Sequence, residues 1–322
     1  MSCDKIVLIT QGVNNKSIPY LISNATKEKV KCMENEIRVN RINEHLKNLP
    51  FIIVEEQKSN RNELLRVLEM TRKKEYILHI ENVSSTLEIG GSLLEHPFIP
   101  DNVCNDTPFI NGIFDQACEA AMAALYSGYK ITYGSRTVYT VCRPPGHHAG
   151  KAWVGGYCYL NNAVIALKTI LEGGIKPVGL LDIDFHFGNG SADILVDEPD
   201  TVFVSIHAST ENNYPYTKVI EQNQRQMFIP FVDKPSESEY LDALDKAIDK
   251  IAEYGCKALV VSIGFDIIKG DPHGTWDLST SVFKQVGVRL KKLGIPLCFI
   301  QEGGYLIDKL GECAYQLCCG LK

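Results

Sequence analysis

The sequence predicts a single open α/β domain, with a mainly parallel sheet covered by helices on both faces. Beyond residue 137, short apolar runs typical of buried strands alternate with longer segments of helical periodicity. Such alternation is typical of parallel strands joined by helical crossovers. Neither a composition break nor an internal repeat is found across the 322 residues, so we expect one domain spanning residues 1–322.

Short apolar runs mark the candidate strands. In chain order they are Lys5–Thr10, Phe51–Val54, Val138–Cys142, Val178–Asp184, Val202–Ile206, Met227–Phe231, Ala258–Ile263 and Leu297–Ile300. The residues Val178–Leu181, which precede Asp182 and Asp184, form a continuous apolar run. Such a run is typical of a strand buried on both faces.

Helical periodicity marks the segments between them. The candidate helices are Glu36–Leu49, Asn60–Met70, Phe114–Tyr126, Tyr159–Leu171, Ser236–Tyr254, Ser279–Leu293 and Leu306–Cys319. Pro50 ends the first of them. Residues 84–111 contain a Gly-Gly pair and three prolines without a sustained period, which is typical of a functional or mobile segment.

The composition excludes several classes of protein. A formal charge of −6 and a pI near 5.8 argue against a nucleic-acid partner. Eleven cysteines without a Cys-x-x-Cys pair indicate a reducing compartment, and no apolar run has the length of a signal-peptide core or a membrane span. We therefore expect a cytoplasmic protein without a membrane partner. The sequence leaves the oligomeric state open, a homodimer included.

The chemistry is concentrated where the fourth candidate strand ends. Asp182, Asp184 and His186 follow one another at a spacing of two, so on a strand their side chains share one face. Unpaired buried charge is costly, and a divalent metal would compensate it. Gly188 and Gly190 then allow a sharp turn. A solvated acidic loop is the alternative, and a metal site explains the pattern better.

Polar groups, most of them titratable, lie at or just beyond the ends of five candidate strands. Because ligands of open α/β sheets bind beyond the carboxyl ends of the strands, we expect these groups at one edge. They are His147 and His148; Asp182, Asp184 and His186; Ser205 and His207; Asp266, Asp271 and His273; and Glu302 and Tyr305. The convergence predicts one polar site.

One histidine and two aspartates suit a catalytic zinc with an open position, although Fe(II) accepts the same ligand types. Asp184, His186 and Asp266 fit, but spacing alone does not show that Asp266 joins the other two. His147-His148 could supply a general base and a general acid, whereas adjacent histidines are more often one functional and one structural residue. These groups favour metal-assisted amide hydrolysis.

Tyr305, which follows two glycines, could place a phenol donor where an oxyanion develops. Simple packing is the alternative for a lone tyrosine at such a turn. Together with the metal ligands and the histidines, a donor here completes the parts that amide hydrolysis requires.

Six motifs are specific in their residues: Asp106-Thr107-Pro108, Arg143–Ala149, Gly155–Asn162, Asp182–Gly190, Gly264–Pro272 and Glu302–Tyr305. Through them the chain resembles the metal-dependent deacetylases, which include histone deacetylases and bacterial acetylpolyamine amidohydrolases. The resemblance covers residues 106–305, with a weaker echo near Glu34–Arg38. It implies an arginase/deacetylase-like fold with a largely parallel eight-stranded sheet.

The resemblance also implies roles for individual residues. The zinc ligands would be Asp184, His186 and Asp266, and the catalytic residues His147, His148, Tyr305, Asp182 and Asn189. In this scheme Asp182 is the partner of the first histidine and Asn189 of the second. Because a carboxylate keeps an imidazole charged more readily than an amide does, the two histidines should differ in pKa.

Two further sets of residues follow from the resemblance. A structural potassium ion is implied near Asp182, Asp184, His186, Ser205 and Ile206. The substrate tunnel and its rim are implied at Asp106, Gly156, Tyr157, Tyr214 and His273.

Three stretches depart from the family pattern. Phe187 stands where a second histidine usually follows the zinc histidine, which puts the hydrogen bonding there in doubt. The usual His-Pro-Glu is absent at Met33–Glu36, so we expect the first rim loop to differ. A glycine-bearing turn is also missing after Tyr214-Pro215-Tyr216.

These features predict zinc-dependent hydrolysis of an N-acetylated amine. The Gly155–Asn162 motif, Glu302 and Tyr214-Pro215-Tyr216 resemble acetylpolyamine amidohydrolases more than histone deacetylases. This resemblance implies an acetylpolyamine or acetylated diamine as substrate, with protein acetyl-lysine as the alternative. Two aromatic walls, Tyr157 and Tyr214, would attract a slim alkyl-ammonium chain. Acidic residues of the irregular segment, among them Glu88, Glu95 and Asp101, could add negative charge at the mouth.

Two other functions fit the sequence less well. A two-manganese ureohydrolase needs carboxylates where this chain has Gly188 and Gly264. A non-catalytic binding protein would carry lesions at Tyr305 or at the metal ligands, and the sequence has none there.

Overall fold

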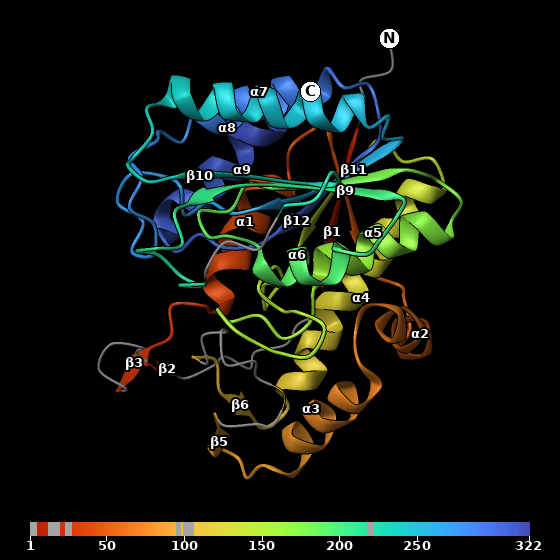
Figure 1. Cartoon of the computed structure of the whole chain (residues 1–322), viewed down its shortest axis with the longest axis vertical. Coiled ribbons are helices and arrows are strands. Elements are labelled where there is room, and N and C mark those ends of the chain that lie inside the picture. The colour runs from red at the N-terminus through yellow and green to blue at the C-terminus, as the bar shows by residue number, and fades with distance from the viewer. Residues whose placement is uncertain (1–4, 12–19, 23–27, 95–97, 99–105, 218–221) are drawn as a thin grey trace.

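A computed structural model describes residues 5–11, 20–22, 28–94, 98, 106–217 and 222–322. Within these residues, eight parallel strands form one sheet in the order β10-β9-β8-β11-β12-β7-β1-β4 (Figure 1). The strands are β1 Ile6–Thr10, β4 Ile52–Glu56, β7 Thr137–Val141, β8 Val178–Asp182, β9 Thr201–Ala208, β10 Gln226–Phe231, β11 Ala258–Ile263 and β12 Leu297–Gln301. The predicted fold class is confirmed, and all eight predicted strands are present.

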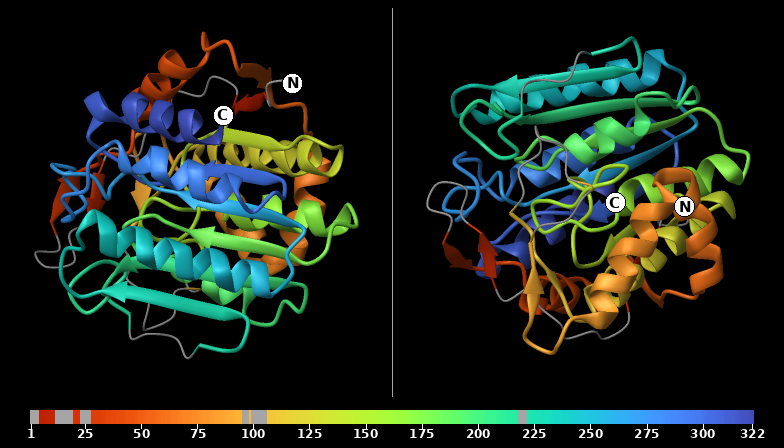
Figure 2. Two further views of the ribbon diagram at one scale, coloured as in Figure 1. Left: turned by 90° about the horizontal axis from the view of Figure 1, so that it is seen from above. Right: turned by 60° about the horizontal axis from the view of Figure 1, so that its bottom comes forward.

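Helices cover both faces of this sheet (Figures 1 and 2). One face carries α1 Glu36–Leu46, α7 Glu237–Glu253, α8 Val282–Lys291 and α9 Ile307–Leu321, and the other carries α4 Ile113–Thr132, α5 Asn162–Glu172 and α6 Asn189–Leu195. The central strands β7, β8, β9, β11 and β12 are buried along their whole length as a result. Their apolar side chains form the two main cores with the helices.

A third layer lies beyond α4. Helices α2 Arg61–Thr71 and α3 Lys74–Thr86 pack there (Figure 2), and α3 contacts one of two short antiparallel pairs, β5–β6. These pairs are β2 Tyr20–Ile22 with β3 Lys29–Lys31, and β5 Ser92–Leu93 with β6 Phe109–Ile110. Helix α3 was not predicted, because lysines at its start and a Ser-Ser-Thr end obscure its apolar period.

Four predicted helices differ from the structure by three or more residues at one end. Helix α1 ends at Leu46 rather than Leu49, and helix α5 begins at Asn162 rather than Tyr159. Helix α4 continues past Tyr126, the predicted end, to Thr132. At Gly128 a Cβ atom would lie 2.7 Å from Thr169 Cβ, so glycine here allows α4 and α5 to pack closely although it is a weak helix former. Helix α8 begins at Val282 rather than Ser279, because residues 279–281 form a turn.

Helix α7 shows how local sequence sets an element. The side chain of Ser236 accepts a hydrogen bond from the backbone N–H of Glu239, and the side chain of Glu239 accepts one from the backbone N–H of Ser236. This reciprocal pair is a capping box, and it starts the helix.

Within the described part of the chain, no helix combines the length and the apolar character that crossing a membrane requires.

Candidate active site

A cavity opens at the carboxyl edge of the sheet, where the sequence predicted one site. It is lined by Asp106, Pro145, His147, His148, Gly156, Tyr157, Asp184, His186, Tyr214, His273, Gly303 and Tyr305. Loops that follow β7, β8, β9, β11 and β12 supply most of these residues. Parallel strands end at the same edge, and that is why groups more than 150 residues apart in sequence meet here.

The three predicted metal ligands lie together. One ligand atom from each of Asp184, His186 and Asp266 falls within 4.8 Å of the other two. Nδ1 of His186 is 3.1 Å from Oδ1 of Asp184 and 3.2 Å from Oδ2 of Asp266. The sequence alone did not show that Asp266 joins the other two, and the structure places it there.

Backbone contacts hold the two carboxylates in position. Oδ2 of Asp184 accepts a hydrogen bond from the Gly303 N–H at 2.8 Å, and Oδ1 of Asp266 accepts one from the Phe185 N–H at 3.1 Å. A Cβ atom on Gly264 would lie 2.2 Å from Oδ2 of Asp184, and one on Gly303 would lie 2.4 Å from Oδ2 of Asp266. Glycine is therefore required at both positions.

The donor set fits a divalent cation. Oδ2 of Asp266 is buried and accepts no well-aligned hydrogen bond from a described residue. Burial and the neighbouring charge of Asp184 raise the pKa of Asp266 to about 7. Two buried carboxylates that repel each other across an imidazole form an unfavourable arrangement, and a cation between them would relieve it.

The tandem histidines have unlike partners, as predicted. Nδ1 of His147 lies 3.0 Å from Oδ2 of Asp182, and Nδ1 of His148 lies 2.8 Å from Oδ1 of Asn189. Burial alone would lower the pKa of His147, but the carboxylates of Asp184 and Asp182 outweigh it and raise the pKa to about 10. Burial and then the charge of His147 hold the pKa of His148 well below its usual range. The predicted separation is thus present.

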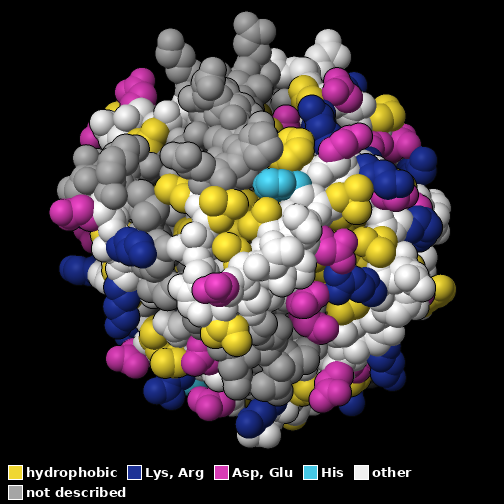
Figure 3. Space-filling model, turned by 90° about the horizontal axis from the view of Figure 1, so that it is seen from below, with side chains coloured by type: hydrophobic (Ala, Val, Ile, Leu, Met, Phe, Trp, Pro, Cys, Tyr) yellow, Lys and Arg dark blue, Asp and Glu magenta, His cyan; other side chains and the backbone are white. Residues whose placement is uncertain are grey.

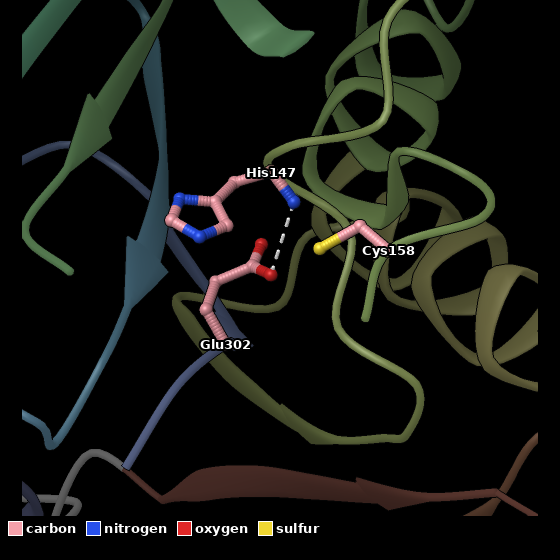
Figure 4. A group of neighbouring side chains, drawn as sticks. All are labelled: His147, Cys158 and Glu302. Carbon is pink, nitrogen blue, oxygen red and sulfur yellow. Dashed lines mark hydrogen bonds between the residues drawn. The ribbon is translucent and has the colours of Figure 1, made fainter. Parts of the chain in front are cut away.

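Glu302 anchors the turn that carries the histidines (Figure 4). Its Oε2 accepts hydrogen bonds from the N–H groups of Gly146 at 2.7 Å and His147 at 3.2 Å, and its Oε1 accepts one from the Ser262 hydroxyl at 3.0 Å. Cys158 lies close to His147 and Glu302, and the three side chains form a second group whose atoms are near enough to one another to hold a metal ion. Because both Glu302 oxygens already accept hydrogen bonds, we interpret this group as structural.

Tyr305 enters the cavity from the loop after β12. Oδ2 of Asp271 accepts hydrogen bonds from the N–H groups of Tyr305 at 2.6 Å and Leu306 at 2.9 Å. The guanidinium of Arg38 lies 4.6 Å from the centre of the Tyr305 ring and donates to the carbonyl of Gly304 at 2.6 Å. The tyrosine is therefore fixed through its backbone and through one face of its ring.

A buried ion-pair network lies next to Tyr305, and the sequence did not predict it. Both carboxylate oxygens of Glu34 accept from Arg143, at 2.8 and 2.7 Å, and Oε1 also accepts from Arg38 at 3.3 Å. All three side chains are 1% exposed. Glu34 belongs to the stretch expected to form a rim loop, but its side chain lies inside the protein. The spacing of four between Glu34 and Arg38 was the available signal.

Aromatic rings form the walls of the cavity. The Tyr157 hydroxyl lies 3.1 Å from Nε2 of His273, and the ring of Tyr214 packs edge-on against His148 at 4.6 Å. A Cβ atom on Gly156 would lie 2.3 Å from Cδ2 of His148, so only glycine fits beside that ring. Burial lowers the pKa of His273 to about 4, which leaves this side chain neutral near pH 7.

Asp106 lies at the rim but is largely engaged. It is 6% exposed, and its Oδ1 accepts from the N–H of Gly156 at 3.0 Å and from the Thr107 hydroxyl at 2.8 Å. Burial raises its pKa to about 6. Glu95 and Asp101, predicted to add charge at the mouth, and the turn after Tyr216 at residues 218–221 lie outside the described residues.

The remaining predicted residues lie behind the cavity. Ser205 and Ile206 lie on β9, where Ser205 pairs in register with Asp182 of β8, and the Ser205 hydroxyl contacts Nδ1 of His207 at 3.0 Å. The Phe187 ring packs against His207 at 4.6 Å. The family's second histidine is therefore replaced here by an apolar contact, and the potassium site stays a prediction.

The comparisons with known proteins decide the family. A family model described as the histone deacetylase domain matches residues 32–321. The chain belongs to this family. The histone deacetylase family implies a divalent metal, for which Asp184, His186 and Asp266 are the candidate ligands.

Several curated relatives are known. Acetylpolyamine amidohydrolase 1 of Pseudomonas aeruginosa is 35% identical over 224 residues, which cover 64% of this chain and 62% of the relative. Acetylpolyamine amidohydrolase of Mycoplana ramosa is 31% identical over 217 residues, covering 65% and 64%. Histone deacetylase 6 of Caenorhabditis elegans is 30% identical over 216 residues, covering 63% and 23%. The matched part thus spans less than two thirds of each relative.

Among solved structures, an acetylpolyamine aminohydrolase from Burkholderia pseudomallei superposes with a TM-score of 0.88, over 98% of both chains. Its sequence identity to this chain is 24%, so this likeness concerns the fold. It agrees with the parallel eight-stranded sheet described above.

Proposed function

We propose that this protein is a zinc-dependent amidohydrolase that removes acetyl groups from N-acetylated amines. The observation that carries the proposal is that one cavity brings together two candidate metal ligands, both tandem histidines and Tyr305. The third ligand, Asp266, lies directly behind them. Relatives named acetylpolyamine amidohydrolases, up to 35% identical to this chain, support the same reaction.

A divalent metal at Asp184, His186 and Asp266 would supply Lewis acidity toward the acetyl carbonyl and the attacking water. The histidines would move the protons. Because Oδ1 of Asn189 is a hydrogen-bond acceptor, neutral His148 carries its proton on Nδ1. Nε2 of His148 is therefore the atom that would accept a proton from water.

His147 complements this base. Asp182 holds its Nδ1 and, with Asp184, favours the charged imidazolium. Its Nε2–H is then the donor available to the leaving amine. A bound dication would offset part of the charge of Asp184 and lower the pKa of His147, which brings this acid closer to neutral pH.

Tyr305 would stabilise the oxyanion. Burial raises the pKa of its hydroxyl well above the usual range, so the group stays protonated and can donate a hydrogen bond. Because Asp271 and Arg38 fix the loop and the ring, this donor is positioned before the substrate binds.

For the substrate we propose an acetylated di- or polyamine. The rings of Tyr157 and Tyr214 border the cavity and would contact an alkyl-ammonium chain by dispersion and cation–π attraction. On the face seen in Figure 3, hydrophobic side chains gather around a histidine, with acidic and basic side chains mixed further out. Asp106 would serve a distal ammonium or the backbone of a peptide equally well, so protein acetyl-lysine is the second candidate.

The test compares substrates on metal-reconstituted enzyme. We expect kcat/KM for acetylputrescine, acetylcadaverine or acetylspermidine to exceed that for acetyl-lysine peptides. A peptide preferred by tenfold, equivalent to about 1.4 kcal/mol of transition-state free energy, would reverse the substrate assignment. Absence of acetate release from every substrate would favour a binding protein. Zinc rather than Fe(II), a structural potassium ion and a cytoplasmic location stay predictions of the sequence, and the sequence leaves a homodimer open.

A further inference from the structure

The turn that carries Tyr157 into the candidate active site is tightly wound. The N–H of Gly155 donates to the carbonyl of Cys158 at 3.2 Å, and the N–H of Cys158 donates back to the carbonyl of Gly155 at 2.8 Å. The two residues between them, Gly156 and Tyr157, have φ angles of 52° and 71°, in the left-handed region. Glycine adopts such angles freely, but a tyrosine does so only where its surroundings hold it there.

The ring of Tyr157 forms part of the cavity wall because of this backbone conformation. The side chain is 4% exposed and lines the cavity. Its hydroxyl lies 3.1 Å from Nε2 of His273, and its ring centre lies 5.7 Å from that of Tyr305. Since the backbone sets the direction in which a side chain leaves it, a different φ at Tyr157 would point the ring away from this wall.

Two side chains from the segment before β6 hold the turn. The central N–H groups of so tight a turn have no partner within it, and both find one outside. Oδ1 of Asp106 accepts from the N–H of Gly156 at 3.0 Å, and Oγ1 of Thr107 accepts from the N–H of Tyr157 at 3.0 Å. The two residues in the left-handed region are therefore the ones that these side chains bind.

Thr107 connects the two contacts. Its hydroxyl accepts from Tyr157 and donates to Oδ1 of Asp106 at 2.8 Å, which uses the single proton that a hydroxyl has. The side chain is 0% exposed, so water does not replace either bond. The carbonyl of the next residue, Pro108, accepts a hydrogen bond from the Tyr159 hydroxyl, which joins the two segments further along.

We propose that Thr107 is a positioning residue for the substrate, which holds the Tyr157 ring in the cavity wall and the Asp106 carboxylate at the rim. Thr107 is not among the residues that line the cavity, so it acts through these two neighbours. The inference rests on the proposed function, because it concerns how the cavity holds an acetylated amine.

Loss of the hydroxyl would change substrate binding more than the chemical step. Without it, the buried N–H of Tyr157 has no acceptor, and the left-handed angle of this bulky residue loses the contact that supports it. The ring would leave the wall, and Asp106 would lose one of its hydrogen-bond donors. The candidate metal ligands and the tandem histidines keep their own contacts, none of which involves Thr107.

The test is steady-state kinetics of the metal-loaded enzyme with the acetylated amine that the wild type hydrolyses best. Thr107→Val keeps the shape of the side chain but lacks the hydroxyl, so KM should rise about tenfold while kcat stays within about twofold. Thr107→Ala, which also lacks the hydroxyl, should show the same separation. Thr107→Ser keeps the hydroxyl and should keep KM within about twofold of the wild type. An unchanged KM in Thr107→Val and Thr107→Ala, or an equal rise in Thr107→Ser, would overturn the proposal.

Thr169→Val is the matched control, because this threonine is also buried but its hydroxyl donates to the Ile165 carbonyl within α5. KM should not change there, and an equal rise would overturn the proposal, because KM would then report general loosening of the fold. Hydrogen exchange is a readout that needs no activity: the amides of Gly156 and Tyr157 should exchange about tenfold faster in Thr107→Val than in Thr107→Ser. Equal exchange would overturn the proposal even in an active enzyme, whereas absence of acetate release by the wild type would refute the proposed function alone.

Discussion

Asp271 offers a direct test of how Tyr305 is held. Its two oxygens accept three backbone hydrogen bonds, from Tyr305 and Leu306 to Oδ2 and from His273 to Oδ1 at 2.9 Å. In Asp271→Asn one end of the side chain becomes a donor, so at least one of these N–H groups faces another donor and stays unpaired. Since the residue is 6% exposed, water does not replace the lost acceptor fully.

The cost of such a buried unpaired group is about 1–3 kcal/mol. We expect the free energy of unfolding to fall by about 2 kcal/mol and Tm by roughly 4 °C. We also expect kcat to fall about tenfold, because the Tyr305 hydroxyl is less firmly positioned, a loss equivalent to about 1.4 kcal/mol. KM and metal content should stay unchanged, because Asp271 supplies none of the candidate metal ligands.

Calorimetry, elemental analysis and steady-state kinetics on one preparation separate these effects. Asp277→Asn is the control, because this side chain is 52% exposed and pairs with Lys234 at 3.0 Å at the surface. A variant that melts lower but keeps the wild-type kcat would refute the positioning role of Asp271. Loss of metal in proportion to activity would show instead that the carboxylate acts through the metal site.

Three further variants test other parts of the site. Tyr305→Phe should keep the metal and the Tm but lose about 10²–10³ in kcat, and near-normal turnover would mean that another group stabilises the oxyanion. Gly264→Ala should lower metal content and activity together, because the new Cβ would meet Oδ2 of Asp184 at 2.2 Å; elemental analysis showing full metal content would contradict the required close approach. Phe187→His should lower the free energy of unfolding by about 1–3 kcal/mol, because the new imidazole would lie between His207 and Phe228. Urea titration measures this change, and an unchanged midpoint would show that the imidazole finds a partner there.

Much of the sheet follows from local sequence. The buried parallel strands are short apolar runs, and their alternation with helical periods determines the topology within a few choices. The convergence of the site follows as well, because ligand groups in such folds gather at one edge. That Asp266 joins Asp184 was predictable only through the family resemblance. The two residues follow β8 and β11, which are neighbours in the sheet but have β9, β10 and two helices between them in the sequence.

Other features depend on contacts that no local pattern contains. The network of Glu34, Arg38 and Arg143 joins α1 and the segment before it to the loop after β7, and no local pattern pairs Glu34 with Arg143 across that distance in the sequence. The short helix α6 and the helix α3 have weak apolar periods and owe their stability to tertiary packing. The contact of the buried Arg72 guanidinium with the Trp153 carbonyl is likewise visible only once the α2–α3 turn has been placed against the loop at Trp153.

In the proposed mechanism one metal ion, held by Asp184, His186 and Asp266, supports hydrolysis of an acetylated amine. The most direct measurement is a titration of metal-free enzyme with zinc while acetate release from acetylputrescine is followed. We expect activity to rise linearly and to saturate at about one equivalent per chain, and Asp266→Ala to show neither tight binding nor activity. Saturation at two equivalents, or metal-independent acetate release, would contradict the claim.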